Sequence, residues 1–163
     1  MKKLALIFAM LFLLGCNDEL VHTPINSKDS FKTTTEKISK NIKIDGWDKP
    51  FLLYYFTSSC DICAAQVPIL NEILQERNGK IKLIGVLGDT KGVDDDLKTI
   101  ASKNITFPVV SNKKSVKFLA KAVGGIMATP VTVIFDKNGK QVKMLLGLYP
   151  KSTFESELKL LGE

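Results

Sequence analysis

The sequence lacks the features that mark several large classes of protein. Its longest apolar run, residues 4–14, has 11 residues, whereas a helix that crosses a bilayer needs roughly 20. The formal net charge is +6, but the lysines form no dense basic block, so we expect no nucleic-acid partner. One histidine and three cysteines among 163 residues leave few ligands for a metal ion, so we predict neither a metal site nor a cofactor.

The N-terminal residues have the pattern of a bacterial export signal. Met1 is followed by two lysines and then by the apolar run, which ends in Leu13-Leu14-Gly15-Cys16. This ending resembles the bacterial lipobox, in which a small residue precedes a cysteine that is acylated and becomes the new N-terminus. We therefore predict a lipoprotein signal peptide over residues 1–15 and an anchor to the membrane through lipidation of Cys16. The alternative is an ordinary signal peptide followed by an unmodified cysteine.

Lipidation of Cys16 leaves two cysteines, Cys60 and Cys63, which are spaced C-x-x-C in an exported protein. This pattern predicts a redox-active dithiol, and three alternatives compete with it. A zinc site needs four ligands, and only His22 is left to add to the two cysteines. A structural disulfide that closes so short a loop adds little stability. A peroxidatic cysteine needs a nearby arginine, and the single arginine, Arg77, lies several turns away along the same predicted helix.

The chain divides into a polar N-terminal segment and one α/β domain. Residues 17–41 are rich in Ser, Thr, Lys and Asn, so we expect residues 16–41 to be a lipidated flexible tether in which His22 is solvated. From residue 42 to residue 163 strands and helices alternate. Their order predicts a sheet with parallel early strands and a final antiparallel hairpin at Asn138-Gly139. Strands are expected at 51–56, 81–87, 107–110, 131–135 and 141–146, and helices at 60–77, 92–103, 113–123 and 152–161.

The two cysteines of the C-x-x-C motif have different expected roles. Cys60 falls where a strand ends and a helix begins, so backbone N–H groups and the helix dipole should lower the pKa of its thiol. Cys63 lies one turn further along the helix and should be less exposed. We expect Cys60 to attack a partner disulfide as a thiolate and Cys63 to resolve the mixed disulfide. Asp61 opposes a very low thiolate pKa, which favours a reducing pair.

A second motif, Thr129-Pro130, directly precedes the predicted strand 131–135. With the C-x-x-C before it and a hairpin and a last helix after it, the chain resembles the thioredoxin superfamily. In that family a Thr-Pro with a cis peptide bond faces the dithiol and pairs with the substrate backbone. The resemblance implies an α/β thioredoxin-like fold, with a central mixed β-sheet and helices on both faces. It also implies that Thr129 and Pro130 bind substrate.

Within this superfamily, residues 42–163 resemble the membrane-anchored TlpA/ResA group. The resemblance rests on the extra helical segment 92–103, on the extended piece 107–110 that follows it, and on Pro68 in the first helix. Members of this group usually reduce disulfides in exported proteins, notably apocytochromes c, and draw electrons from a membrane transporter of the thiol type. The resemblance implies a monomeric protein-disulfide reductase at the periplasmic face of the inner membrane.

Three positions depart from the family pattern. Ser59 replaces the usual Trp before the first cysteine, Gln66 replaces a Glu that many members carry, and Tyr54 replaces the buried Asp of thioredoxins. A carboxylate at such a position helps to move the proton of the resolving thiol, so its absence leaves the proton route unassigned. A disulfide oxidase or isomerase and a non-enzymatic binding protein of the same fold stay open as alternatives.

Overall fold

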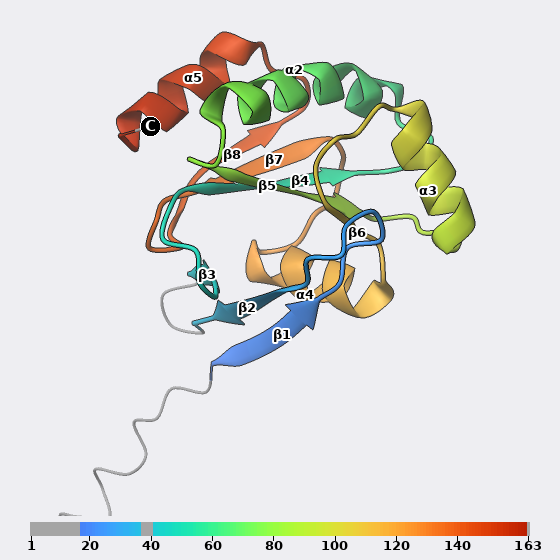
Figure 1. The fold of residues 1–163 in the computed structure, drawn as a ribbon, viewed down its shortest axis with the longest axis horizontal. Coiled ribbons are helices and arrows are strands. Elements are labelled where there is room, and N and C mark those ends of the chain that lie inside the picture. The colour runs from blue at the N-terminus through green and yellow to red at the C-terminus, as the bar shows by residue number, and fades with distance from the viewer. Residues whose placement is uncertain (1–16, 37–40, 163) are drawn as a thin grey trace, which may run out of the picture.

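The computed structural model describes residues 17–36 and 41–162 of the chain. These residues form two β-sheets and four helices, and the larger sheet lies in the middle of the molecule (Figure 1). Among the helices of these two ranges, none combines the length and the hydropathy that a membrane span requires. The predicted signal peptide, residues 1–15, and the predicted lipidation site, Cys16, lie outside the described residues.

The central sheet is mixed, as the sequence predicts. Its strands are β4 (Phe51–Phe56), β5 (Lys82–Leu87), β6 (Val109–Val110), β7 (Val131–Phe135) and β8 (Gln141–Leu146). They are arranged in the order β6-β5-β4-β7-β8. β5 pairs in parallel with β4 and β6, whereas β7 pairs antiparallel with β4 and β8. The thioredoxin-like sheet expected from the sequence is therefore confirmed.

The strand β4 organises the hydrophobic core because it is central and all six of its residues are buried. Successive side chains of a strand point to opposite faces of the sheet, so β4 contributes to two cores. Tyr54 belongs to the core beneath α2 (Asp61–Arg77) and α5 (Lys151–Leu160). Its neighbour Tyr55 belongs to the core against α4 (Lys113–Ala122). Helices therefore cover both faces of the sheet (Figure 1).

The predicted flexible tether is wrong for the described residues of that segment. β1 (Asp18–His22), β2 (Phe31–Thr35) and β3 (Ile42–Ile44) form a separate antiparallel sheet beside α4 (Figure 1). Composition concealed these strands because most of their side chains are polar. Threonine and phenylalanine nevertheless favour strands, and a small sheet needs few buried residues when it packs on a larger domain.

His22 shows how the small sheet attaches to the domain. Its side chain is fully buried, not solvated as we expected. The ring stacks on Phe31, meets the edge of Phe118 from α4, and bonds through Nε2 to the Thr33 hydroxyl at 2.7 Å. Its Nδ1 is buried and has no hydrogen-bond partner among the described residues. The small sheet therefore depends on a neutral imidazole.

The loop between β1 and β2 closes one edge of the central sheet. Ile25 donates its backbone N–H to the carbonyl of Val109 at 2.9 Å. The Asn26 amide bonds the Phe107 carbonyl at 2.9 Å and accepts from the Val109 N–H at 2.8 Å. The short edge strand β6 is thus covered, which protects it from pairing with other chains.

We predict that protonation of His22 destabilises the protein. Burial lowers the pKa of His22 to about 4 from its ordinary value of 6.5. The unfolded chain therefore binds the proton first as the pH falls, so this stabilisation is complete above pH 6.5 and declines toward pH 4. The free energy of unfolding, measured with urea, should drop by about 2 kcal/mol between pH 7.5 and pH 5.

The control for this prediction is His22→Leu. The chain has one histidine, and most carboxyl groups titrate below pH 5. The variant should therefore lose the pH dependence between pH 7.5 and pH 5, whatever its overall stability. If the free energy of unfolding of His22→Leu fell with pH as steeply as that of the wild type, the pH dependence could not be assigned to His22.

Candidate active site

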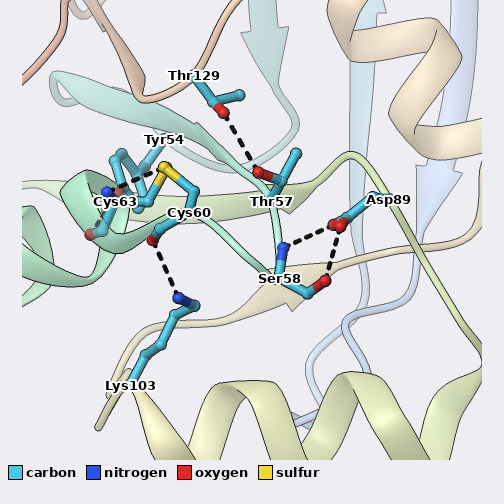
Figure 2. Close-up of a disulfide and its surroundings, with 8 residues drawn as sticks. All are labelled: Tyr54, Thr57, Ser58, Cys60, Cys63, Asp89, Lys103 and Thr129. Carbon is cyan, nitrogen blue, oxygen red and sulfur yellow. Dashed lines mark hydrogen bonds between the residues drawn. A yellow bond between two sulfur atoms is a disulfide. The ribbon is translucent and has the colours of Figure 1, made fainter.

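Cys60 is the N-cap residue of α2, directly after the turn that follows β4 (Figure 2). Its backbone is extended, with φ −91° and ψ 108°, and its Sγ accepts a hydrogen bond from the Cys63 N–H at 3.0 Å. The two cysteines form a disulfide with their Cα atoms 5.2 Å apart. Cys60 is partly exposed and Cys63 is fully buried, which confirms the expected difference in exposure. A helix N-terminus that already donates to sulfur also favours a thiolate there.

The Thr129–Pro130 motif lies beside this turn. Its peptide bond is cis, as predicted. The Thr129 hydroxyl is 3.4 Å from the hydroxyl of Thr57, which lies three residues before Cys60 (Figure 2). The structure therefore brings the predicted substrate-binding loop to the same end of the sheet as the dithiol. The pairing of Thr129 and Pro130 with a substrate backbone stays a prediction.

Two charged residues that the sequence did not single out bind the backbone of the active-site turn. Asp89, after β5, accepts from the Ser58 N–H at 2.7 Å and from the Ser58 hydroxyl at 2.6 Å. Lys103 donates from Nζ to the Cys60 carbonyl at 3.1 Å (Figure 2). Asp89 lies 31 residues from Ser58 in the sequence, and Lys103 lies 43 residues from Cys60. No local sequence pattern therefore indicates these contacts.

Tyr54 occupies the position where thioredoxins have a buried Asp. Its hydroxyl donates to the Cys63 carbonyl at 2.7 Å, and the residue is fully buried. Burial raises the pKa of Tyr54 well above its usual range, so the hydroxyl stays protonated and remains a donor. Tyr54 therefore fixes the backbone of the resolving cysteine and supplies no carboxylate.

Gln66 occupies the position of the family's Glu and is also fully buried. Its Nε2 donates to the Tyr149 carbonyl at 3.2 Å, and its Oε1 accepts from the Tyr149 N–H at 2.8 Å. The amide thus joins α2 to the segment before α5. Both positions where a carboxylate was expected hold neutral side chains that bind backbone, so neither supplies a base for Cys63.

A cavity of about 330 Å³ adjoins the site on the side of the Thr129–Pro130 loop. Its wall is mostly apolar, and its lining includes Thr57, Asp89, Val116, Ile126, Met127 and Thr129. The Met127 side chain is fully exposed, although large apolar side chains are usually buried.

Within residues 17–36 and 41–162, no cluster of three or more His, Cys, Asp or Glu side chains is arranged to hold a metal ion.

Comparison with known proteins agrees with this geometry. Residues 39–162 match the family described as thioredoxin-like domain. Thioredoxin 1 of Nostoc sp. is 28% identical over 112 residues, which cover 69% of this chain and 79% of that protein. The thiol-disulfide oxidoreductase ResA of Geobacillus thermodenitrificans is 27% identical over 68% of this chain and 62% of its own length. A thiol:disulfide interchange protein from Chlorobium tepidum superposes with a TM-score of 0.67 at 14% identity, over 88% of this chain and 92% of that one, which shows a shared fold.

We predict that Gln66→Glu makes the stability of the protein depend on pH. A buried carboxyl group can donate to the Tyr149 carbonyl only when it is protonated, so burial should raise the pKa of the new Glu above its usual value of about 4.3. The folded protein then keeps a proton that the unfolded chain releases. The free energy of unfolding should therefore fall by roughly 2–4 kcal/mol, relative to the wild type, as the pH rises from 4 to 8.

Gln75→Glu is the matched control, because Gln75 lies on the same helix and is exposed. Its stability profile should follow that of the wild type. The free energy of unfolding is measured with urea at each pH. If that of Gln66→Glu depended on pH as the wild type does, burial would not raise the pKa of the new carboxyl group and the prediction would be wrong.

Proposed function

Since the chain belongs to the family of thioredoxin-like domains and is a thiol-disulfide oxidoreductase, we propose that it reduces disulfides in exported proteins of the bacterial cell envelope. The observation that carries this proposal is the arrangement of the two cysteines. A partly exposed Cys60 caps the N-terminus of α2, and a fully buried Cys63 lies behind it. One sulfur is open to a partner protein, and the other is shielded from one.

The reaction follows from this arrangement. In the reduced protein the Cys60 thiolate attacks one sulfur of a substrate disulfide, and the other substrate sulfur leaves as a thiolate that takes up a proton. Cys63 then loses its proton and attacks Cys60, which releases the second substrate sulfur. Two electrons have passed to the substrate, and the Cys60–Cys63 disulfide remains. A dithiol donor must reduce that disulfide again before the next cycle.

One of the charges near the dithiol, that of Asp61 in the first turn of α2, favours the reductase direction of electron flow. Asp61 is exposed there, next to Cys60. A negative neighbour weakens the stabilisation of the thiolate, and weaker stabilisation makes the pair more reducing. Because the space outside the cytoplasm is oxidising, we propose that a membrane electron donor of the thiol-transporter type keeps the dithiol reduced. Apocytochrome c is a candidate substrate through the resemblance to the TlpA/ResA group.

We propose further that the protein is held at the periplasmic face of the inner membrane by lipids on Cys16. β1 begins at Asp18, two residues after this cysteine. A lipid on Cys16 would therefore hold the domain close to the headgroups, and no long tether would separate them. More than one acyl chain is needed for an anchor of this kind to be stable.

We predict a low reduction potential for the Cys60–Cys63 pair. The purified protein is equilibrated in dithiothreitol and glutathione buffers, and its free thiols are trapped by alkylation. A reductase should give a value near or below about −220 mV, in the range of thioredoxin and glutaredoxins. Cys60→Ser should abolish all turnover with a disulfide substrate, because the attacking sulfur is lost.

Two results would contradict this proposal in different ways. A potential near about −120 mV, the value of DsbA, would make disulfide formation the function instead. A Cys60→Ser variant that binds its partner as tightly as the wild type, together with a wild type that shows no turnover, would favour a non-enzymatic binding protein.

We also predict that Cys16→Ser abolishes lipidation. Grown in a bacterial host with an alkyne fatty acid, the wild type should take up the label and sediment with membranes. Cys16→Ser should do neither, because the acylated residue is missing. Cys60→Ser is the control and should be labelled like the wild type. Label retained by Cys16→Ser would exclude this residue as the anchor.

A further inference from the structure

Lys103 ends α3 (Val93–Ser102) and is its C-cap residue. The C-terminal end of α3 lies next to the start of α2 (Figure 1). From there the side chain extends to the active-site turn, and Nζ donates to the Cys60 carbonyl at 3.1 Å (Figure 2). Because this carbonyl and the sulfur belong to the same residue, the ammonium group lies no farther from the sulfur than about one Debye length, about 8 Å at physiological salt.

The loop that carries Lys103 is fixed on both sides. On one side, the Lys103 N–H bonds the Thr99 carbonyl of α3 at 3.1 Å. On the other side, Asn71 of α2 donates to the Asn104 carbonyl at 2.7 Å. The Asn71 side-chain oxygen also accepts from the Thr106 hydroxyl at 2.8 Å and from the Thr106 N–H at 3.3 Å. The position of Lys103 is therefore set by α2 and α3 together.

In the oxidised protein the ammonium group of Lys103 has a neutral partner, the Cys60 carbonyl. The N-terminus of a helix carries partial positive charge, so a cation near it is repelled. Within the described part of the chain, none of the ion pairs involves Lys103. Reduction of the disulfide by a dithiol donor supplies an anion, because two electrons and one proton convert the S–S bond into a thiolate at Cys60 and a thiol at Cys63.

We infer that Lys103 is a positioning residue for disulfide exchange, one that holds a positive charge at the Cys60 carbonyl, from which it stabilises the Cys60 thiolate when the pair is reduced. The other ionisable groups around the turn are Asp61, which opposes this effect, Asp89, which is bonded to Ser58, and the buried, neutral Tyr54. Lys103 thus offsets Asp61. An attacking thiol works best when its pKa is near the ambient pH, and the two opposite charges serve that condition.

This inference rests on the dithiol chemistry proposed above and not on the direction of electron flow. Lys103→Gln, Lys103→Arg and Lys98→Gln are compared with the wild type in the reduced state. Lys98 is the matched control, because it lies on α3, is exposed and pairs with Asp95. The rate of alkylation by iodoacetamide is measured against pH, and the Cys60 peptide is followed by mass spectrometry.

In Lys103→Gln we expect the pH at the midpoint of Cys60 alkylation to rise by about half a pH unit to one pH unit. Alkylation well below the midpoint should then slow by about 3- to 10-fold, as expected for one charge several ångströms away whose field is largely screened by water. The equilibrium constant for reduction of its disulfide by glutathione should fall by a similar factor. Lys103→Arg, which keeps the charge, and Lys98→Gln should both remain close to the wild type.

The inference would be overturned if Cys60 of Lys103→Gln were alkylated with the same pH midpoint as in the wild type. It would also be overturned if Lys98→Gln shifted that midpoint as much as Lys103→Gln, because the effect would then come from net charge in general. Unfolding curves check that each variant is folded. If Lys103→Gln does not fold, Asn71→Ala is used instead, because it removes the hydrogen bonds that hold the loop but keeps the lysine. It should raise the midpoint of Cys60 alkylation by less than Lys103→Gln would. An unchanged midpoint in Asn71→Ala would count against the inference. A wild-type potential in the oxidising range, together with a shift in Lys103→Gln, would refute the reductase and leave the role of Lys103 intact.

Discussion

The cap of α2 by a sulfur atom is the interaction on which the rest of the site depends. A helix N-terminus leaves backbone N–H groups without partners, and a side chain usually supplies oxygen to one of them. Here Cys60 Sγ takes that place and accepts from Cys63. The reactive sulfur is therefore held at the point where the backbone best stabilises negative charge. The same contact places the second cysteine one turn deeper, inside the core.

Contacts from four separate parts of the chain hold this cap in position. β4 delivers the turn from the centre of the sheet, and Asp89 fixes its backbone from the next strand along. Thr129 approaches from the loop before β7, and Lys103 from the end of α3. All of these groups lie at or just beyond strand or helix ends. A site of this kind is rigid because its supports belong to the packed scaffold.

The charges of the site lie at its surface, not in its core. Tyr54 and Gln66 occupy positions where relatives carry carboxylates, and both use their polar atoms to bind backbone carbonyls or N–H groups. A buried carboxylate would have to be paired or neutralised, and no lysine or arginine is buried among the described residues. Among the ionisable neighbours of Cys60, Asp61 is exposed and Lys103 is partly exposed, so solvent screens both charges.

The order of strands and helices from residue 51 onward follows from the sequence, because hydrophobic periodicity and helix or turn signals are local. The sequence also indicates that Cys60 begins a helix and that Thr129-Pro130 precedes a strand. What Tyr54 and Gln66 bind and which charges surround Cys60 could be seen only in the folded chain, since these partners are up to 83 residues apart. The structure also revealed the small N-terminal sheet. This sheet covers an apolar surface on α4. The composition of its polar strands does not reveal that they pack against another part of the chain.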